Sequence, residues 1–387
     1  MGNHFSIVHI ITGLTTGGAE MMLYQMLTKS DRERFSPIVI SLIDRGALGD
    51  RIEALGIPVY TIGIKPGMPP TPAAMWRLVK IMRQLKPDLI QSWMYHGNLV
   101  AQFSSFFYVQ EIPIFWSIHS TVYTLDSEKI MTKGVIKLGD LFSQFPKQII
   151  YVSKISKSQH EALGYCQENG CVIPNGVDHS RYIPSREARL SVRGELGLPE
   201  QSFLIGLICR YHPMKDHANF LQAASLLLKD RPDIHFMLVG TEVDRDNRVL
   251  THLIENLGIA NQTHLLGERT DIPRLTAALD IASSSSAYGE AFSLAVAEAM
   301  ACGLPCVVTD VGDSGWIVSN TGMVVSPRDS LALANAWKEL IDLNDESREA
   351  LGKAARMRII ENFTLDAVVA QYQALYENYL IKNVSKR

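Results

Sequence analysis

The sequence predicts an α/β protein built from two Rossmann-like, doubly wound domains. Short runs rich in Val and Ile alternate with longer amphipathic stretches, a pattern typical of βα units that build a parallel sheet. This alternation occurs twice within 387 residues, a length that favours two domains with a core each. Hydrophobic residues make up 47% and charged residues 20%, so the chain has the composition of a folded globular protein.

We expect six strands in each half, with amphipathic helices between them. In the first half the strands are expected at residues 6–11, 38–42, 59–62, 89–93, 114–119 and 148–152. In the second half they are expected at residues 204–208, 235–239, 263–266, 281–283, 306–309 and 322–324. Residues 365–380 place Val, Leu and Tyr side chains near helical spacing, which predicts a terminal amphipathic helix.

The best domain boundary is a turn cluster at residues 174–178, which a polar stretch follows up to Pro199. We therefore expect a first domain at residues 1–177 and a second at 178–364. The helix at about 365–387 is expected to cross back to the first domain. Two such domains should face each other across a cleft lined by the carboxyl ends of their strands, where doubly wound sheets bind ligands.

Charge and cysteine content disfavour several classes of protein. Residues 1–177 carry 16 Lys and Arg against 13 Asp and Glu, and residues 178–387 carry 21 against 27. This small, dispersed basic excess disfavours a nucleic-acid partner. Five cysteines without framework spacing indicate reduced thiols, and the apolar run at 5–11 is too short for a membrane span and lacks a cleavage site. We therefore expect a cytoplasmic protein.

A glycine-rich loop at residues 12–20 follows the first strand and opens a helix. Gly17 and Gly18 let backbone amides approach a phosphate or a sugar at the helix start. The loop lacks the Gly-Lys-Ser/Thr of a Walker loop and the Gly-x-Gly-x-x-Gly of a dinucleotide site. A plain tight turn is an equal alternative.

Two cations, Arg210 and Lys215, follow the strand expected at 204–208. At the carboxyl end of a parallel strand they can converge on one diphosphate, the Arg as a planar fork and the Lys as a point charge. A solvated surface pair is the alternative. We interpret the neighbouring His212 and His217 as structural residues.

The most specific stretch is residues 286–309, which contain Glu290 and Glu298 around an expected helix start. We expect the first amides of this helix, from Phe292 to Leu294, to point into the cleft and to bind phosphate or sugar oxygens. Carboxylates at these positions can accept hydrogen bonds from paired sugar hydroxyls. Gly303 should end the helix.

Four motifs, in this order along the chain, carry a resemblance to a known family. They are the Gly-Gly-Ala-Glu loop, the turn at 174–178, the Arg210 to Lys215 pair and the Glu290-x7-Glu298 string. Together they resemble the retaining nucleotide-sugar glycosyltransferases of family 4, which have the GT-B fold. The resemblance spans almost the whole chain and is more specific in the second half.

The resemblance implies an enzyme that moves a hexose or N-acetylhexosamine from a nucleotide sugar, above all a UDP-sugar, to an acceptor. The first choice of acceptor is a glycan or lipid-linked precursor of a surface polysaccharide or glycoconjugate. A soluble small-molecule acceptor is one alternative, and a sugar-nucleotide epimerase on the same fold is another. No metal or other cofactor is implied.

The resemblance also assigns roles to single residues. Arg210 and Lys215 hold the donor diphosphate, Glu298 binds the ribose hydroxyls, and Glu290 contacts the transferred sugar. The expected catalytic residues are His119, Arg210, Lys215 and Glu290, with His119 near the reacting sugar. The other expected donor contacts are Gly17, Gly18, Arg269 and the backbone of Ala291, Phe292, Ser293 and Leu294.

The family mechanism is front-face displacement, in which the departing phosphate oxygen accepts the proton of the acceptor hydroxyl. The protein then acts mainly by electrostatic stabilisation, and two close carboxylates are not required. The string Asp244-Arg245-Asp246 matches the Asp-x-Asp of metal-dependent transferases, but it stands in a polar loop without that motif's context. We interpret it as a solvated loop.

Two further classes lack a matching feature. A two-lobed solute receptor predicts an export signal, and a phosphorylase needs a pyridoxal-phosphate lysine on a longer chain. Residues 129–147 mix four lysines, Lys129, Lys133, Lys137 and Lys147, with apolar side chains. This mixture allows peripheral contact with the inner face of a membrane, although an ordinary helix packed on the sheet is the alternative.

Overall fold

The computed structural model describes residues 4–15, 17–108, 110–122 and 130–384. The chain divides into two compact domains. The first domain comprises Met1–Gly176 with Leu365–Arg387, and the second comprises Val177–Thr364. This division falls one residue before the boundary expected from the turn cluster.

A parallel sheet in the order β3-β2-β1-β4-β5-β6-β7 forms the centre of the first domain. The strands are β1 (Phe5–Ile11), β2 (Phe35–Ser41), β3 (Val59–Thr61), β4 (Leu89–Trp93), β5 (Ile114–Ile118), β6 (Gln148–Tyr151) and β7 (Gly170–Val172). All six predicted strands are present. Strand β7 was not predicted, because its three residues, Gly-Cys-Val, are too few to show a pattern.

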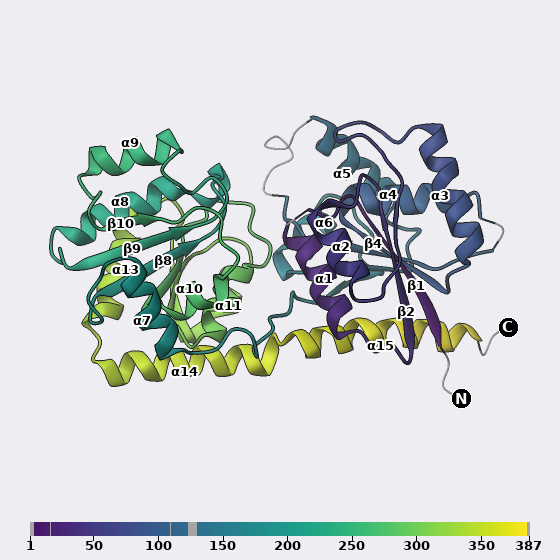
Figure 1. Ribbon diagram of the computed structural model, residues 1–387. Coiled ribbons are helices and arrows are strands. Elements are labelled where there is room, and N and C mark those ends of the chain that lie inside the picture. The colour runs from purple at the N-terminus through teal and green to yellow at the C-terminus, as the bar shows by residue number, and fades with distance from the viewer. Residues whose placement is uncertain (1–3, 16, 109, 123–129, 385–387) are drawn as a thin grey trace. The chain divides into compact units, whose positions relative to one another are not determined.

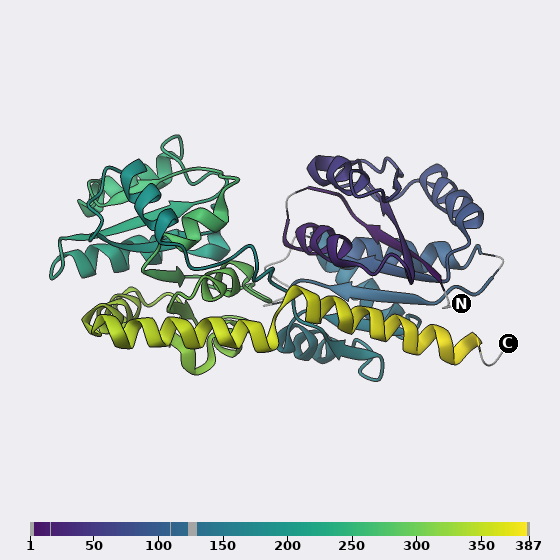
Figure 2. The same cartoon turned by 60° about the horizontal axis from the view of Figure 1, so that its bottom comes forward.

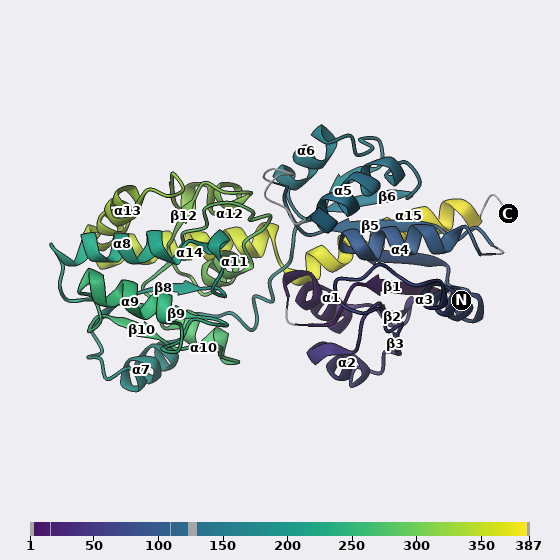
Figure 3. The same cartoon turned by 90° about the horizontal axis from the view of Figure 1, so that it is seen from above.

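Helices cover both faces of this sheet (Figures 1 and 3). They are α1 (Gly18–Lys29), α2 (Gly46–Glu53), α3 (Pro72–Leu85), α4 (Met94–Ser105), α5 (Ile130–Phe142), α6 (Lys154–Ala162) and α15 (Leu365–Val384). Side chains of α1, α2 and α15 share one core with the sheet, and those of α3, α4 and α5 share the other. The two cores sandwich the sheet, as a doubly wound domain requires.

The terminal helix belongs to the first domain (Figure 2). Val368, Tyr372, Tyr376 and Leu380 recur every four residues and are buried in the same core as α1. This spacing puts the four side chains on one face of the helix.

The second domain repeats the scheme with a sheet in the order β10-β9-β8-β11-β12-β13. Its strands are β8 (Phe203–Ile208), β9 (Ile234–Val239), β10 (Thr263–Leu265), β11 (Ile281–Ser284), β12 (Cys306–Thr309) and β13 (Gly322–Val325). Each one was predicted to within a few residues. The predicted class, α/β with two doubly wound parallel sheets, is confirmed.

The helices of the second domain include two short 3-10 segments, η2 and η3. The full set is α7 (Arg186–Glu195), η2 (Pro213–Lys215), α8 (His217–Leu228), α9 (Arg248–Leu257), α10 (Ile272–Ala277), α11 (Leu294–Ala301), α12 (Ser314–Val318), η3 (Ser319–Thr321), α13 (Ser330–Asp342) and α14 (Asp345–Asn362). The rings of Phe220, Phe236 and Trp337 meet edge-on or tilted between the sheet and α8 and α13. This aromatic cluster anchors one layer of helices on the sheet.

Strand order reverses once in each sheet, between β1 and β4 and between β8 and β11. A crevice for a ligand forms at such a reversal, outside the carboxyl ends of the strands. The loops after β1, β4, β8 and β11 are therefore the candidate positions for a ligand site. None of the helices in the described ranges has the length and apolar character needed to cross a bilayer.

Candidate active site

In the second domain, the loop after β8 and the loop after β11 meet at the reversal of strand order. Pro213 starts the η2 segment, which His212 caps by accepting a hydrogen bond from the backbone N–H of Met214 at 3.2 Å. The backbone N–H of Ala287 donates to the carbonyl of Met214 at 2.8 Å, and the hydroxyl of Ser285 donates to the carbonyl of Lys215 at 2.8 Å. These bonds hold the two loops side by side.

Lys215 and Glu290 form a buried ion pair where these loops meet. The Nζ of Lys215 bonds to Oε2 of Glu290, and the hydroxyl of Ser286 donates to the same oxygen at 3.0 Å. Burial is the largest single influence and opposes both charges, but the partner's charge and the hydrogen bonds together outweigh it. The pKa of Glu290 is therefore lowered and the pKa of Lys215 is raised.

Arg210 adds a second positive charge to this cluster. Its side chain is exposed at the end of β8, and it forms no ion pair within the described part of the chain. It lies close enough to Glu290 for its charge to contribute to the lowered pKa of that carboxyl. The structure thus brings Arg210, Lys215 and Glu290 together, as the sequence predicted.

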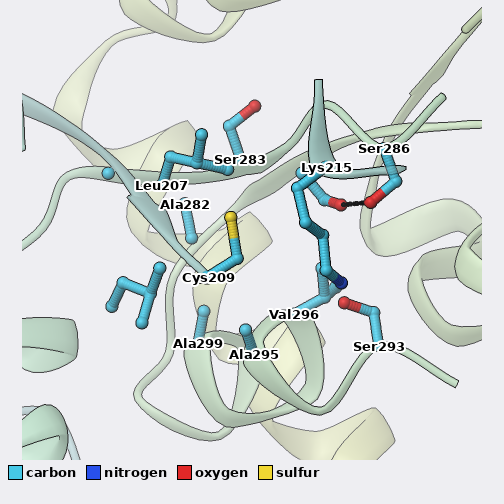
Figure 4. A pocket seen from close by; sticks show the side chains of 13 residues that line it. Leu207, Cys209, Lys215, Ala282, Ser283, Ser286, Ser293, Ala295, Val296 and Ala299 are labelled. Atoms are coloured by element: carbon cyan, nitrogen blue, oxygen red, sulfur yellow. Dashed lines mark hydrogen bonds between the residues drawn. The ribbon is translucent and has the colours of Figure 1, made fainter. Parts of the chain in front are cut away.

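A small pocket of about 20 Å³ lies beneath these groups (Figure 4). Mostly short side chains from β8, β11 and α11 line the pocket, together with the side chain of Lys215. Figure 4 shows the ends of Lys215 and Ser293 pointing toward one another. The pocket holds about one water molecule, so it forms the floor of a site and not the volume that a nucleotide fills.

Helix α11 begins later than predicted. It starts at Leu294, with Ser293 as an N-cap whose side chain makes no capping bond, so the amides of its first turn have no partner inside the helix. The prediction that Phe292 supplies the first helical amide is wrong. The carbonyl of Ala291 accepts from the backbone of Asp313 at 3.2 Å, and the Phe292 ring packs on Phe363, which keeps this segment outside the helix.

Two glycines shape the Glu290 segment. Gly289 and Gly312 have φ values of +76° and +59°, which other residues rarely adopt. A Cβ on Gly312 would lie 1.7 Å from the carbonyl oxygen of Glu290, and a Cβ on Gly289 would lie 2.6 Å from Sδ of Met214. Gly312 therefore requires glycine for space as well as for conformation, whereas Gly289 requires it for conformation, because the Met214 side chain can move.

Glu298 lies further along α11 and is half-buried. Burial raises the pKa of Glu298 to about 7, against a hydrogen bond from Tyr182 and the charge of Arg181. Arg356 fixes the chain around Tyr182 by donating to the carbonyl of Tyr182 at 2.8 Å. Tyr182 is not among the residues predicted from the sequence, because the polar stretch around it has the composition of a linker.

Arg269, one of the predicted donor contacts, belongs to an ion-pair network. Its guanidinium pairs with Asp271 at 2.9 Å and with Glu195 of α7 at 2.6 Å, and these bonds raise its pKa. Arg274 joins the same network through Glu195 and Asp271. The network joins the loop before α10 and α10 itself to α7.

In the first domain, His119 directly follows β5 at the carboxyl edge of the sheet. Its ring stacks on Trp93, with centroids 5.0 Å apart, and its Nε2 bonds to the hydroxyl of Ser117 at 2.8 Å. Burial lowers the pKa of His119 to about 3. Asn175 lies beside the ring, yet Nδ1 of His119 and Oδ1 of Asn175 have no well-aligned hydrogen-bond partner in the described residues.

A hydrogen-bond chain that the sequence did not predict lies beside His119. The hydroxyl of Ser120 donates to Tyr95 at 2.9 Å, and Tyr95 contacts Nε2 of His160 at 2.7 Å. Nδ1 of His160 lies 2.7 Å from the carbonyl of Ser156 and so carries the ring hydrogen, which makes Nε2 the acceptor for Tyr95. Hydrogen bonding thus fixes the direction of the Ser120 hydroxyl at the carboxyl edge.

Gly17 and Gly18 open helix α1 after β1. Gly17 is the N-cap in an extended conformation and makes no side-chain cap, and neither residue has a positive φ. A Cβ on Gly17 would meet the Glu20 carboxylate at 2.3 Å, whereas a Cβ on Gly18 would meet nothing within 4 Å. Gly18 therefore has open space beside it and Gly17 lies against the Glu20 carboxylate, while neither has an unusual backbone conformation.

The Asp244-Arg245-Asp246 string forms a local turn. Oδ1 of Asp244 accepts the backbone N–H of Asp246 at 3.0 Å and that of Asn247 at 3.2 Å. Its carboxylate thus shapes the loop before α9. Within the described ranges, three or more His, Cys, Asp or Glu side chains nowhere gather in a way that could hold a metal ion.

Two family sequence profiles match the chain, one to each domain. "Glycosyltransferase Family 4" matches residues 16–181, and "Glycosyl transferases group 1" matches residues 189–358. The two matches together span most of the chain.

Curated relatives are similar over part of their length. UDP-Gal:alpha-D-GlcNAc-diphosphoundecaprenol alpha-1,3-galactosyltransferase of Escherichia coli is 28% identical over 218 residues, 54% of this chain and 54% of that protein. N-acetyl-alpha-D-glucosaminyl L-malate synthase of Bacillus anthracis is 26% identical over 273 residues, 70% of this chain and 69% of that protein. The chain spans about half the length of several of the curated relatives it matches.

Solved structures are similar over nearly the whole chain. Anabaena Alr3699/HepE in complex with UDP and glucose has a TM-score of 0.83 and 25% identity, covering 96% of this chain and 99% of that one. WaaG, a glycosyltransferase involved in lipopolysaccharide biosynthesis, has a TM-score of 0.71 and 16% identity over 96% of this chain and 99% of that one. The likeness to WaaG shows the fold alone.

Two doubly wound parallel sheets with these structural neighbours define the GT-B class of fold. The chain belongs to the glycosyltransferases, with a family 4 domain followed by a group 1 domain. The predicted fold class and family are both confirmed.

Proposed function

We propose that the protein is a retaining glycosyltransferase that moves a hexose or N-acetylhexosamine from a UDP-sugar to a lipid-linked or glycan acceptor, in the synthesis of a surface polysaccharide or glycoconjugate. The observation that carries the proposal is the cluster of Lys215, Glu290 and Arg210 at the reversal of strand order in the second domain. Opposite charges and exposed amides at such a place suit a sugar diphosphate.

The second domain is assigned to the donor. Arg210 and Lys215 supply positive charge where the diphosphate gains negative charge as its bond to the sugar breaks. The first-turn amides of α11, at Leu294 and beyond, can donate to phosphate oxygens. Glu298 in its charged form accepts hydrogen bonds from the ribose hydroxyls, and Glu290 accepts those of the transferred sugar.

The first domain is assigned to the acceptor. His119 is neutral at pH 7 because burial lowers its pKa to about 3, so it can hydrogen-bond a sugar hydroxyl without adding charge. The backbone at Gly17 and Gly18, at the start of α1, is a further proposed contact for the diphosphate. In front-face displacement the departing phosphate oxygen takes the proton of the acceptor hydroxyl, so the mechanism requires no protein base.

The choice of UDP and of a lipid-linked acceptor is supported by similar proteins. The Escherichia coli relative is named for UDP-Gal and a diphosphoundecaprenol acceptor, and the Anabaena protein was solved with UDP and glucose. Isothermal titration of the full chain with UDP-, GDP- and ADP-sugars tests the donor. We expect binding of a UDP-sugar alone, and preference for GDP or ADP would overturn the nucleotide assignment.

Product analysis tests the acceptor and the stereochemistry. The full chain is incubated with the bound UDP-sugar and either a GlcNAc-diphospho-polyprenol in detergent or free GlcNAc. We expect transfer to the lipid-linked acceptor, with the α configuration at the new bond seen by NMR. Transfer to free GlcNAc alone would favour a soluble acceptor, and a β bond would overturn retention.

We also propose that the reaction needs no metal ion. Arg210 and Lys215 supply the charge that a divalent ion would bring, and Asp244 is engaged in its own turn. Excess chelator should leave the initial rate unchanged. Loss of activity that magnesium or manganese restores would show that leaving-group stabilisation depends on a metal.

A further inference from the structure

Helix α5 exposes apolar side chains along its outer face. Met131, Leu138, Leu141 and Phe145 are 51%, 42%, 65% and 45% exposed. Their spacing of seven, three and four residues places them in one stripe that runs from the start of α5 past its end. The other face of α5 packs on the sheet through Val135, Ile136 and Phe142, as the packed-helix alternative predicted, while this stripe stays exposed. Lys129 lies outside the described residues.

The stripe continues across the ends of neighbouring helices. Phe106 and Phe107, just after α4, are 56% and 52% exposed, and Trp76 of α3 is 58% exposed. The Phe106 ring meets Phe145 at 6.0 Å, and Trp76 meets Phe107 at 6.2 Å. We name the apolar patch the connected set Trp76, Phe106, Phe107, Leu138, Leu141 and Phe145.

Basic side chains border the apolar patch. The Arg83 guanidinium lies 5.9 Å from the Trp76 ring centroid and donates to the carbonyl of Phe107 at 2.8 Å. Lys137 is exposed within the α5 stripe, and Lys147 is 40% exposed after Phe145. The acidic groups nearby are Glu111, which pairs with Lys147 at 3.0 Å, and the half-buried Asp140.

A cavity of about 360 Å³ opens behind the rings of Phe106 and Phe145. Gln102, Glu111 and Lys147 also line it. Lys147 keeps 40% of its side chain exposed beside Glu111. The cavity therefore offers the Lys147 ammonium to a phosphate, at the rim of an apolar surface.

We propose that the apolar patch docks on an anionic lipid bilayer, with the cavity receiving a lipid headgroup. Exposed Trp, Phe and Leu side chains flanked by Lys and Arg match a bilayer interface, where apolar groups enter the acyl boundary and cations meet anionic headgroups. A soluble protein seldom exposes such a connected apolar surface without a partner. The choice of a bilayer over a protein partner rests in part on the proposed function, because a lipid-linked acceptor resides in a membrane.

Cosedimentation of the full chain with vesicles tests the proposal. Phosphatidylcholine vesicles with and without about 30% phosphatidylglycerol are compared at about 0.1 M and 0.5 M salt. We expect at least about tenfold more binding to the anionic vesicles at low salt, and release of most of it at high salt. Leu141→Ser should lower the binding about tenfold, because it removes an apolar side chain from the interface.

A matched control is Leu331→Ser, which changes a Leu of similar exposure, 59%, on α13 of the second domain. It should leave vesicle binding unchanged. The proposal would be overturned by equal binding to neutral and anionic vesicles, by binding to neither, or by wild-type vesicle binding in Leu141→Ser. A dimer in light scattering that Leu141→Ser dissolves would assign the patch to a second copy of the chain instead.

Transfer to a detergent-solubilised acceptor separates this proposal from the proposed function. Leu141→Ser should retain wild-type turnover in detergent, because Leu141 lies on an exposed helix face that does not line the candidate active site. If the wild type binds vesicles but transfers no sugar, the proposed function fails and the docking surface stands.

Discussion

Lys215 and Glu290 neutralise each other in a buried ion pair that joins the loop after β8 to the loop after β11. Removing either partner would leave an unpaired charge in a site with little water, which costs far more than the pair itself contributes. In the function proposed above, a bound diphosphate would give Lys215 a second anionic partner. Donor binding and the release of Glu290 toward the sugar would then be linked through one lysine.

Lys215→Ala should cut turnover at least about 100-fold, because one preorganised contact to the developing charge of the diphosphate typically lowers the barrier by ~3 kcal/mol. The variant should also lose stability, since the buried Glu290 is left with only the hydrogen bond from Ser286 and the more distant charge of Arg210. The double variant Lys215→Ala/Glu290→Gln removes that stranded charge. It should regain the unfolding temperature without regaining turnover. Near-wild-type turnover in the single variant would contradict the proposed role of Lys215 at the diphosphate.

Glu290→Gln should bind UDP more tightly than the wild type while turning over more slowly. The amide keeps the hydrogen bond from Ser286 but releases Lys215, and it removes a negative charge near the diphosphate. We expect about a tenfold gain in UDP affinity by calorimetry, equivalent to about 1.4 kcal/mol. Weaker UDP binding would instead mean that the ion pair holds Lys215 in its binding position.

Sequence patterns were sufficient for the sheets but not for side-chain partners. Of the thirteen strands within the described residues, periodicity located twelve and missed β7, whose three residues are too few for a pattern. The positions of Lys215 and Glu290 after their strands placed both residues at the same edge of the sheet, because loops that follow neighbouring parallel strands meet at one edge. Arg269 pairs with Glu195 of α7, 74 positions away along the chain, and Glu298 contacts Tyr182, 116 positions away. Local patterns carry no information on such pairings.

Gly312→Ala should disrupt the Glu290 loop. The substitution forces Ala into a left-handed conformation and places its Cβ 1.7 Å from the Glu290 carbonyl oxygen. Gly258→Ala is the matched control, because Gly258 has a similar φ of +68° but nothing within 4 Å of the added Cβ. We expect a loss of about 1 kcal/mol for the control. Gly312→Ala should lower the free energy of unfolding by about 3 kcal/mol or more and should weaken UDP binding. Equal losses of stability in the two variants would show that the Glu290 loop relaxes around the added Cβ.

Glu298 should make donor binding depend on pH near neutrality. Burial raises the pKa of Glu298 to about 7, and only the charged carboxylate accepts hydrogen bonds from both ribose hydroxyls. UDP affinity should therefore rise as pH increases from 6 to 8. The nucleotide phosphate also titrates in this range, so the measurement is the difference between wild type and Glu298→Gln, in which the contribution of the carboxyl disappears.

The stability of the unliganded protein should change with pH in the opposite direction. A carboxyl whose pKa is higher in the folded state than in the unfolded state holds more protons when folded, so stability is lost as pH rises from about 4.5 to about 7. Tyr182→Phe removes a hydrogen bond that opposes this rise in pKa, and it should move the midpoint of UDP binding to a higher pH. A midpoint that moves to lower pH, or a Glu298→Gln variant with the wild-type profile, would show that another group controls donor binding.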